Sequence, residues 1–329
     1  MHHPARPAPV PDRQPAVAGP SRLDRLPPQS FFLVSAVFHY LGPALAVLLF
    51  TRISVLGVAW LRIMTAAVVF ALWRRPWRAA LRLDRGGRRV LAAFGGVLAA
   101  MNTLFYLAVD RLPLATVGAI EFLGTVLLAA LGARTRRNAA ALALAVAGVA
   151  TITDIRIAGQ PLGFAFAFGN CALFMLYVVL GHKIANTGPA AAGSAGAEVP
   201  GRAAGAGRDM MSGIDQLGAA MLIAAVVIAP FGLGAATRAL SSPLLLLAGA
   251  GVGVCSSVIP YVTDQLAMAR LPRATFALML ALLPAFATLI GAVVLGQIPT
   301  AQELAGIALV MAGIAVHQAP SLPAHRQGD

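Results

Sequence analysis

The chain has 329 residues, of which 59% are hydrophobic and only 11% are charged, and its mean hydropathy is +0.80. A soluble domain of this size could not cover its surface with so few charges, so the composition indicates an integral membrane protein. The net charge of +13 would suit nucleic acid, but the arginines lie between apolar blocks and no basic patch is interleaved with aromatic residues.

The apolar blocks predict ten membrane spans. Residues 1–29 are rich in Pro, Ala and Arg, which indicates a disordered tail rather than a signal peptide. The spans that follow approach the ~20 residues needed to cross a bilayer. They are expected at 30–50, 54–73, 90–109, 112–132, 137–154, 161–181, 214–234, 243–269, 272–295 and 301–318. The low-complexity connection 182–213 predicts a flexible linker, and 319–329 a short tail.

The positive charges predict the orientation of these spans. Counted over alternate connections, 20 Lys and Arg residues fall on one side and 4 on the other, while Arg62 lies inside the second span. Positive residues gather on the cytoplasmic side of membrane proteins. We therefore expect both termini and the 182–213 linker in the cytoplasm of a cell whose inner membrane holds the protein.

One phrase of the sequence occurs twice. Residues 106–124 and 265–283 share 8 identities in 19, including Arg-Leu-Pro-x-Ala-Thr, and Glu121 of the first copy corresponds to Leu280 of the second. Chance similarity between Leu- and Ala-rich helices is the alternative to duplication. Five spans in each half give the halves opposite topology, so we expect an all-α fold of two inverted five-helix repeats, 30–154 and 155–318.

Two ionisable residues lie deep inside predicted spans. Glu121 and Arg62 are nine and eight residues from the outer ends of their spans, or roughly 14 and 12 Å deep. Charges at such depth are functional candidates. One interpretation makes Glu121 a proton carrier or an amine ligand and Arg62 a carboxylate ligand. The other is a structural Arg62–Glu121 ion pair.

Further polar residues complete the candidate site. The eighth span carries the densest group, Ser256, Ser257, Tyr261 and Asp264 around Pro260. Asp264 has an alternative role as an interfacial partner of an arginine, and the serines have one in helix packing. Single polar residues within other spans are His39, Asn102 and Asn170, each also explained as an interhelical hydrogen-bond partner. Tyr106 and Tyr177 are interpreted as packing or interface residues. Three prolines are expected to bend their helices, namely Pro43, Pro260 and Pro284.

Soluble-enzyme chemistry is absent from the sequence. There is no Walker motif, no GxGxxG that opens a nucleotide fold, no nucleophile elbow and no Cys/His metal spacing. The two cysteines, Cys171 and Cys255, lie in apolar blocks. We therefore expect no enzyme activity, cofactor, metal site or nucleic-acid partner.

Two segments carry a resemblance to a known family, VGAIEFLGT (117–125) and SSVIPYVTDQLAMARLPRATFALMLALLPAFATLIGAVVLGQIPT (256–300). With these segments the chain resembles the EamA family of the drug/metabolite transporter superfamily, in the subgroup that exports threonine and homoserine. The first motif departs from the family pattern, because Thr125 stands where proline is usual after Gly124; in the second copy the proline is present as Pro284.

The resemblance implies ten helices and proton-driven export of small amino acids by alternating access, with the bilayer, protons and an amino acid as partners. The residues alone leave other substrates open, such as a cationic drug or another metabolite. They also leave open a membrane sensor that moves nothing, and pairing into a homodimer.

Overall fold

The computed structural model describes residues 27–132, 135–154, 160–185, 202–271 and 273–316. Throughout these ranges the secondary structure is helical, with no strand. The first half contains α1 (Pro28–Leu49), α2 (Val55–Arg74), α3 (Trp77–Arg82), α4 (Arg85–Val109), α5 (Leu114–Gly132) and α6 (Arg136–Asp154). The second contains α7 (Pro161–Ala185), α9 (Arg202–Ala235), α10 (Thr237–Leu240), α11 (Pro243–Gly253), η2 (Val254–Val258), α12 (Ile259–Arg270), α13 (Arg273–Leu280), α14 (Leu283–Leu295) and α15 (Ala301–Val316).

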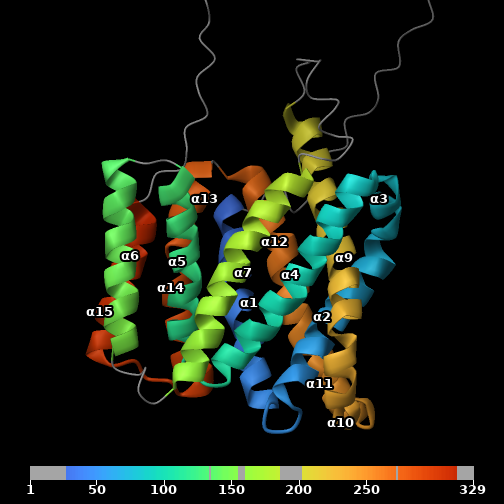
Figure 1. The fold of residues 1–329 in the computed structure, drawn as a ribbon, viewed down its shortest axis with the longest axis horizontal. Helices are drawn as coiled ribbons and strands as arrows, with labels where there is room; N and C mark the ends of the chain where they lie inside the picture. Colours follow the sequence, from blue (N-terminus) through green and yellow to red (C-terminus); the bar gives the residue numbers. More distant parts are fainter. Residues whose placement is uncertain (1–26, 133–134, 155–159, 186–201, 272, 317–329) are drawn as a thin grey trace, which may run out of the picture.

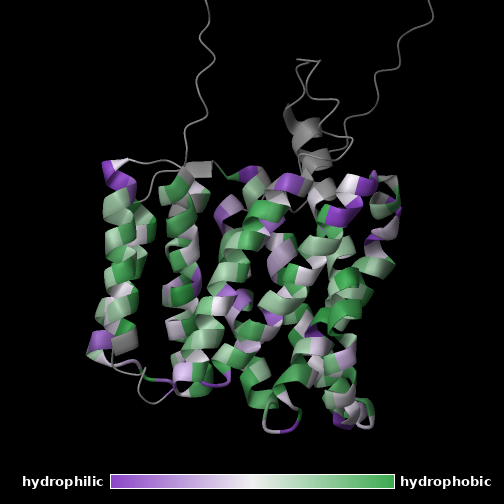
Figure 2. Ribbon diagram, in the orientation of Figure 1, coloured by the Kyte–Doolittle hydropathy of each residue, from purple (hydrophilic) through white to green (hydrophobic). Residues whose placement is uncertain are grey.

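The long helices form a bundle whose surface suits a bilayer. In the described residues, six helices are long and apolar enough to cross a membrane, and three shorter apolar helices accompany them. Hydrophobic residues cover the middle of the bundle, while hydrophilic residues gather at its two ends and at a few points inside (Figure 2). Leu72, Val226 and Val293 are 81%, 74% and 74% exposed, as expected of side chains that face lipid.

Polar residues in the connections determine where several helices begin. Ser54 accepts a hydrogen bond from the Gly57 N–H at the start of α2, and Asp84 does the same for Gly87 at the start of α4. Such side chains satisfy backbone donors that the first turn of a helix leaves free. α14 ends at Gly296, whose φ of 66° is a left-handed conformation that glycine adopts without strain.

Each expected span coincides with helix, and two of them contain interruptions. The eighth span is α11, the π-helical turn η2 and α12 in succession. The ninth, expected as one helix over 272–295, is instead α13 and α14 separated by a turn at Ala281–Leu282. Pro284 lies in the first turn of α14, where its missing N–H does no harm. α5, which lacks the corresponding proline, is continuous.

The predicted flexible segments lie largely outside the described residues. Residues 1–26, 186–201 and 317–329 cover most of the two expected tails and the centre of the 182–213 linker. At the edges of that linker α7 continues to Ala185, and α9 begins already at Arg202.

Small residues let helices from the two halves approach closely. α6 and α15 lie side by side at one edge of the bundle (Figure 1). A Cβ added to Gly148 would lie 2.5 Å from the carbonyl oxygen of Gly306, and one added to Gly313 would lie 2.7 Å from that of Ala141. Glycine is therefore required at these crossings, as expected of packing in lipid, where helices associate by close contact.

Candidate functional site

A small cavity lies at the centre of the bundle, where helices of both halves meet. Its volume is about 60 Å³, and α1, α2, α4, α5, α7 and α12 all contribute to its wall. The lining residues are His39, Pro43, Arg62, Met101, Asn102, Phe105, Glu121, Asn170, Phe174, Tyr177 and Tyr261. Six of the predicted polar site residues and one predicted proline are in this set, although they are far apart in the sequence.

Glu121 is the acidic group of this cavity. Its side chain is 93% buried, and its Oε2 atom has no hydrogen-bond partner in the described part of the chain. The same is true of both amide heteroatoms of Asn170 and of the Tyr40 hydroxyl. Tyr40 lies beside Gly118, one turn of α5 before Glu121. Because buried polar groups normally have partners, this cluster can accept and donate hydrogen bonds to a ligand or take up a proton.

Arg62 is held by the broken eighth span rather than by Glu121. Its Nε atom donates to the Ser257 hydroxyl at 3.0 Å, and Nη2 donates to the backbone carbonyl of Ser256 at 3.2 Å. The predicted alternative of an Arg62–Glu121 ion pair is wrong in this structure: within the described residues the two groups form no contact below 4.0 Å. They are close enough for the charge of Arg62 to act on Glu121.

Pro260 explains why a helix carbonyl is available to Arg62. In an α-helix the carbonyl of Ser256 would accept from the N–H four residues later, but residue 260 is a proline and has no N–H. The helix widens to a π-turn over Val254–Val258, immediately before this proline. Turns of this kind often occur at functional sites. The guanidinium thus supplies a donor at the point where the helix lacks one.

Tyr106 belongs to the same cluster, although sequence analysis had interpreted it as a packing residue. Its hydroxyl lies 3.4 Å from the Ser256 hydroxyl, and the guanidinium of Arg62 is 5.1 Å from its ring centroid. On the other side of Ser256, α1 passes so closely that a Cβ added to Gly42 would lie 2.6 Å from the Ser256 backbone. The π-turn is therefore enclosed by α1, α2 and α4.

The remaining predicted residues occupy different positions. His39 lines the cavity and contacts the Tyr40 ring edge-on at 5.2 Å between centroids. Asn102 also lines it but donates to the Leu98 carbonyl of its own helix at 2.7 Å. Asp264 is not among the lining residues; it lies near Ser35, whose hydroxyl donates to the Pro260 carbonyl at 3.3 Å.

Helical spacing was the signal that could have identified the missed aromatic residues. Asn102 and Tyr106 are four residues apart on α4, and Asn170, Phe174 and Tyr177 follow at intervals of four and three on α7. Residues at such intervals share one helix face. Asn170 therefore marked the face on which Phe174 and Tyr177 meet the cavity, and Asn102 marked the face on which Tyr106 meets Arg62 and Ser256.

The cavity is small for a metabolite in this conformation. A volume of about 60 Å³ is well below the volume of about 300–1,000 Å³ that small-molecule sites usually have. An amino acid would fit only after the surrounding helices separate.

The chain is similar to a known family of transporters and to exporters of that kind. Residues 205–317 match the model of the EamA-like transporter family. The threonine/homoserine exporter RhtA of Escherichia coli (strain K12) is 28% identical over 302 residues, which cover 89% of this chain and 92% of that protein. RhtA of Salmonella typhimurium (strain LT2) is 29% identical over 277 residues, with coverage of 82% and 84%.

A solved crystal structure of another protein shares the fold, with a TM-score of 0.55 and 21% sequence identity over 88% of this chain and 97% of that one. The apolar helices, the site enclosed by both halves and the match over residues 205–317 together lead to one conclusion: this is a multi-pass protein of the cell membrane whose residues 205–317 form an EamA-like transporter family domain.

Proposed function

We propose that the protein is a secondary active transporter that exports small amino acids such as threonine and homoserine in exchange for protons, by alternating access to the central cavity. The observation that carries the proposal is the Glu121 carboxyl, buried between both halves with an oxygen that has no hydrogen-bond partner in the described residues. A carboxyl in this position can hold a proton or a substrate ammonium group, but not both at once. Competition between the two would couple their movements.

The names of the similar exporters support the class of substrate. An α-amino acid carries an ammonium and a carboxylate group. Glu121 would bind the first, and Arg62 the second. Two of the five guanidinium N–H donors are used by Ser257 and Ser256, which leaves donors for a carboxylate. Asn170, with both amide heteroatoms unpartnered in the described chain, would complete the polar contacts.

Two inverted repeats would supply the alternating movement. When Gly148 is aligned with Gly313, Ala141 is aligned with Gly306. The close approach of Gly148 to Gly306 then has its counterpart in that of Gly313 to Ala141. Where a two-fold axis relates two copies, residue i of the first copy contacts residue j of the second, and residue j of the first contacts residue i of the second. The exchanged contacts therefore support the proposal that 30–154 and 155–318 are two copies that arose by duplication.

The short helices support opposite orientation of the two halves. α3 and α10 each connect the second and third long helices of their half, yet they lie at opposite ends of the bundle (Figure 1). Seven arginines lie between residues 74 and 89, in the segment that contains α3, and we assign this end of the bundle to the cytoplasm by the excess of positive charge.

The test is efflux of labelled threonine and homoserine from cells that express the protein, with and without a protonophore. Wild-type cells are expected to show efflux that the protonophore abolishes, and Glu121→Gln cells to show none. Asp110→Asn is the matched control, because Asp110 is a partly exposed carboxylate paired with Arg111 at the end of α4. Wild-type efflux by Glu121→Gln would remove Glu121 from the mechanism.

Organic cations are a second class of substrate that the cavity favours. Four aromatic residues line the same cavity as Glu121, namely Phe105, Phe174, Tyr177 and Tyr261, and aromatic faces bind desolvated cations. Resistance of expressing cells to cationic drugs, without amino-acid efflux, would support this reading. Binding of a ligand without any flux would instead indicate a membrane sensor.

A further inference from the structure

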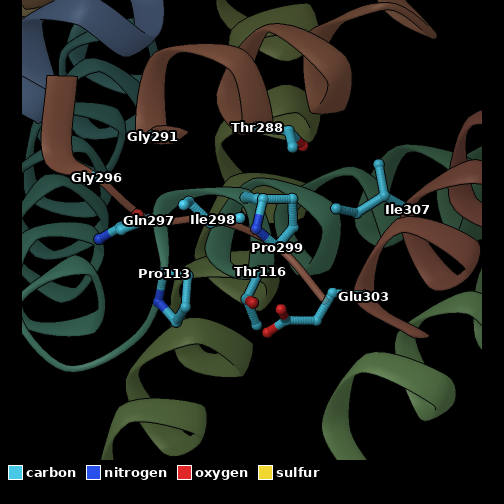
Figure 3. A pocket seen from close by; sticks show the side chains of 11 residues that line it. Pro113, Thr116, Thr288, Gly291, Gly296, Gln297, Ile298, Pro299, Glu303 and Ile307 are labelled. Carbon is cyan, nitrogen blue, oxygen red and sulfur yellow. The ribbon is translucent and has the colours of Figure 1, made fainter. Parts of the chain in front are cut away.

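The end of the bundle opposite α3 contains a cavity of about 290 Å³, between the start of α5, the end of α14 and the start of α15 (Figure 3). An apolar groove of about 390 Å³ between α14 and α15 adjoins it. The Glu303 carboxyl accepts from the N–H and the hydroxyl of Thr300, at 2.8 and 3.2 Å. Gln297 accepts from the Leu114 N–H at 3.0 Å. These polar groups therefore serve the starts of α15 and α5.

The end of the bundle that carries α3 presents positive charges which the described residues do not pair. The side chains of four exposed arginines form no hydrogen bond or ion pair within the described part of the chain. They are Arg75, Arg78, Arg85 and Arg89. Asp84 is the single acidic residue between 74 and 89, against seven arginines. A surface with this excess of charge attracts anions.

The positions of these arginines are unfavourable for the fold itself. Among the described residues, Arg75 is the one non-glycine residue with a positive φ, 52°, at the end of α2. Glycine is the usual residue in that left-handed conformation, because a side chain strains it. Arg85 and Arg89 are one turn apart at the start of α4, where like charges repel and the helix dipole also disfavours them. Residues placed against local preference indicate a role beyond the fold.

Contacts on two sides hold α3 in a fixed position beside these arginines. At its end, the Arg88 guanidinium donates to the carbonyls of Leu83 and Leu81, at 3.0 and 3.1 Å. At its start, Pro76 is buried against α9, where a Cβ added to Gly218 would lie 3.2 Å from the proline ring. α3 is thus anchored at the edge of the bundle (Figure 1).

Exposed aromatic side chains alternate with the arginines. Trp73 and Trp77 are 52% and 44% exposed, in a segment that reads WRRPWR over 73–78. This corrects the expectation that no basic patch is interleaved with aromatic residues. Tryptophan rings gather at the level of lipid head groups in membrane proteins. We call these two tryptophans and the four exposed arginines the basic patch.

The basic patch continues into a surface that faces hydrocarbon. Val68 and Leu72 are 47% and 81% exposed, and they share a face of α2 because they are one turn apart. Leu72 precedes Arg75 by less than one turn. From the end of the bundle inward, the surface is therefore first cationic, then aromatic, then aliphatic. A soluble anion would use only the first part, whereas an amphiphile matches all three.

We propose that the basic patch binds an anionic phospholipid of the surrounding bilayer, such as phosphatidylglycerol, with its phosphate among the arginines and an acyl chain along Leu72 and Val68. Guanidinium groups form strong, charge-assisted hydrogen bonds with phosphate oxygens. A zwitterionic lipid would also bring a cationic group, which the arginines repel. The site is distant from the central cavity, and the inference does not depend on what the protein transports.

The test uses the tryptophans as probes. The purified full-length protein is reconstituted into vesicles of phosphatidylcholine and phosphatidylglycerol, in which one lipid or the other carries brominated acyl chains that quench indole fluorescence on contact. The chain's third tryptophan, Trp60, is buried, so quenching reports on Trp73 and Trp77. The wild type is expected to bind phosphatidylglycerol about tenfold more strongly than phosphatidylcholine at low salt, and less selectively at high salt.

Two substitutions separate lipid binding from the fold. Arg75→Gly removes a charge and places the usual residue in the left-handed position, so the thermal midpoint is not expected to fall. Arg78→Gln changes an exposed residue of α3. Each is expected to lower the preference for phosphatidylglycerol about fivefold, the contribution of one arginine near a bilayer surface, and the double variant to lose it. Arg52→Gln is the matched control, an exposed arginine at the other end of the bundle.

Three results would overturn the proposal. The first is equal quenching of the wild type by the two brominated lipids, or an unchanged preference in the double variant. The second is an equal loss in Arg52→Gln, since the preference would then come from the overall charge of the protein. The third is displacement of phosphatidylglycerol by a soluble single-stranded oligonucleotide, since the basic patch would then be a nucleic-acid site.

Discussion

Arg62 and Pro260 are predicted to be energetically coupled through the Ser256 carbonyl. Arg62→Met keeps much of the apolar stem and removes both hydrogen bonds of the guanidinium, to Ser257 at 3.0 Å and to the Ser256 carbonyl at 3.2 Å. Hydrogen bonds to charged groups contribute about 1.5–3 kcal/mol in soluble proteins, but polar contacts in membranes average about 0.6 kcal/mol with a maximum near 1.7. We therefore expect Arg62→Met to lower the free energy of unfolding by about 2 kcal/mol.

Pro260→Ala should reduce that loss. It restores an N–H four residues after Ser256, so the carbonyl of Ser256 regains a donor within its own helix and depends less on Arg62. In the Pro260→Ala background Arg62→Met is expected to cost about 1 kcal/mol, which gives a coupling of about 1 kcal/mol. A matched control is Pro43→Ala, since Pro43 lines the same cavity from α1 and is not expected to couple to Arg62 in this way.

The assay is equilibrium unfolding in mixed micelles by titration with sodium dodecyl sulfate, followed by circular dichroism, for the wild type, both single variants and the double variant. Independent sites are additive to within about 0.3–0.5 kcal/mol. Additivity of Arg62→Met and Pro260→Ala within that margin would refute the idea that the guanidinium replaces the donor that proline removes.

Three other outcomes are expected. Gly148→Leu should destabilise the protein by several kcal/mol (about 3) and lower its thermal midpoint, because its Cβ would meet the backbone of α15, while Gly96→Leu, with open space around its Cβ, should change the midpoint little. Glu121→Gln should unfold at the same or a higher temperature than the wild type even though efflux is lost; a marked drop in the midpoint would give Glu121 a structural role instead. Asp215→Asn breaks the quarter-exposed ion pair with Arg74 at 2.8 Å, and a loss above about 1 kcal/mol in the same micelle titration would contradict the small value expected of exposed pairs.

The positions of the helices could be predicted well from the sequence because membrane spans are determined by local composition. The expected second span, 54–73, is α2 at Val55–Arg74, and the expected fourth, 112–132, is α5 at Leu114–Gly132. The turn within the ninth span was not predicted, although Pro284 was expected to bend it. A proline shows that a helix can be interrupted, but neighbouring helices decide whether the result is a bend or a turn.

The composition of the central cavity could also be anticipated in large part. Arg62 and Glu121 are expected at similar depths, because depth follows from sequence number at a constant rise per residue, and His39, Asn102 and Asn170 were predicted as single polar residues within other spans. Asp264 was grouped with them and does not line the cavity, while Tyr177 was set aside and does. The error at Asp264 concerns depth, because Asp264 is on the same helix face as Tyr261 but lies one turn closer to the end of α12. The error at Tyr177 concerns residue type, because Tyr177 shares its helix face with Phe174 and was nevertheless interpreted as a packing residue.

The sequence by itself thus indicated the membrane location, the helical segments, the similar depth expected of Arg62 and Glu121, and the internal similarity between 106–124 and 265–283. Only the tertiary structure decided that Arg62 contacts the π-turn instead of Glu121, and that Glu303 borders a cavity open to an apolar groove. The physical reason is that hydropathy and rise per residue act locally along one helix. The choice of partner depends on how glycines such as Gly42 and Gly148 let particular helix faces approach, which is a property of the assembled bundle.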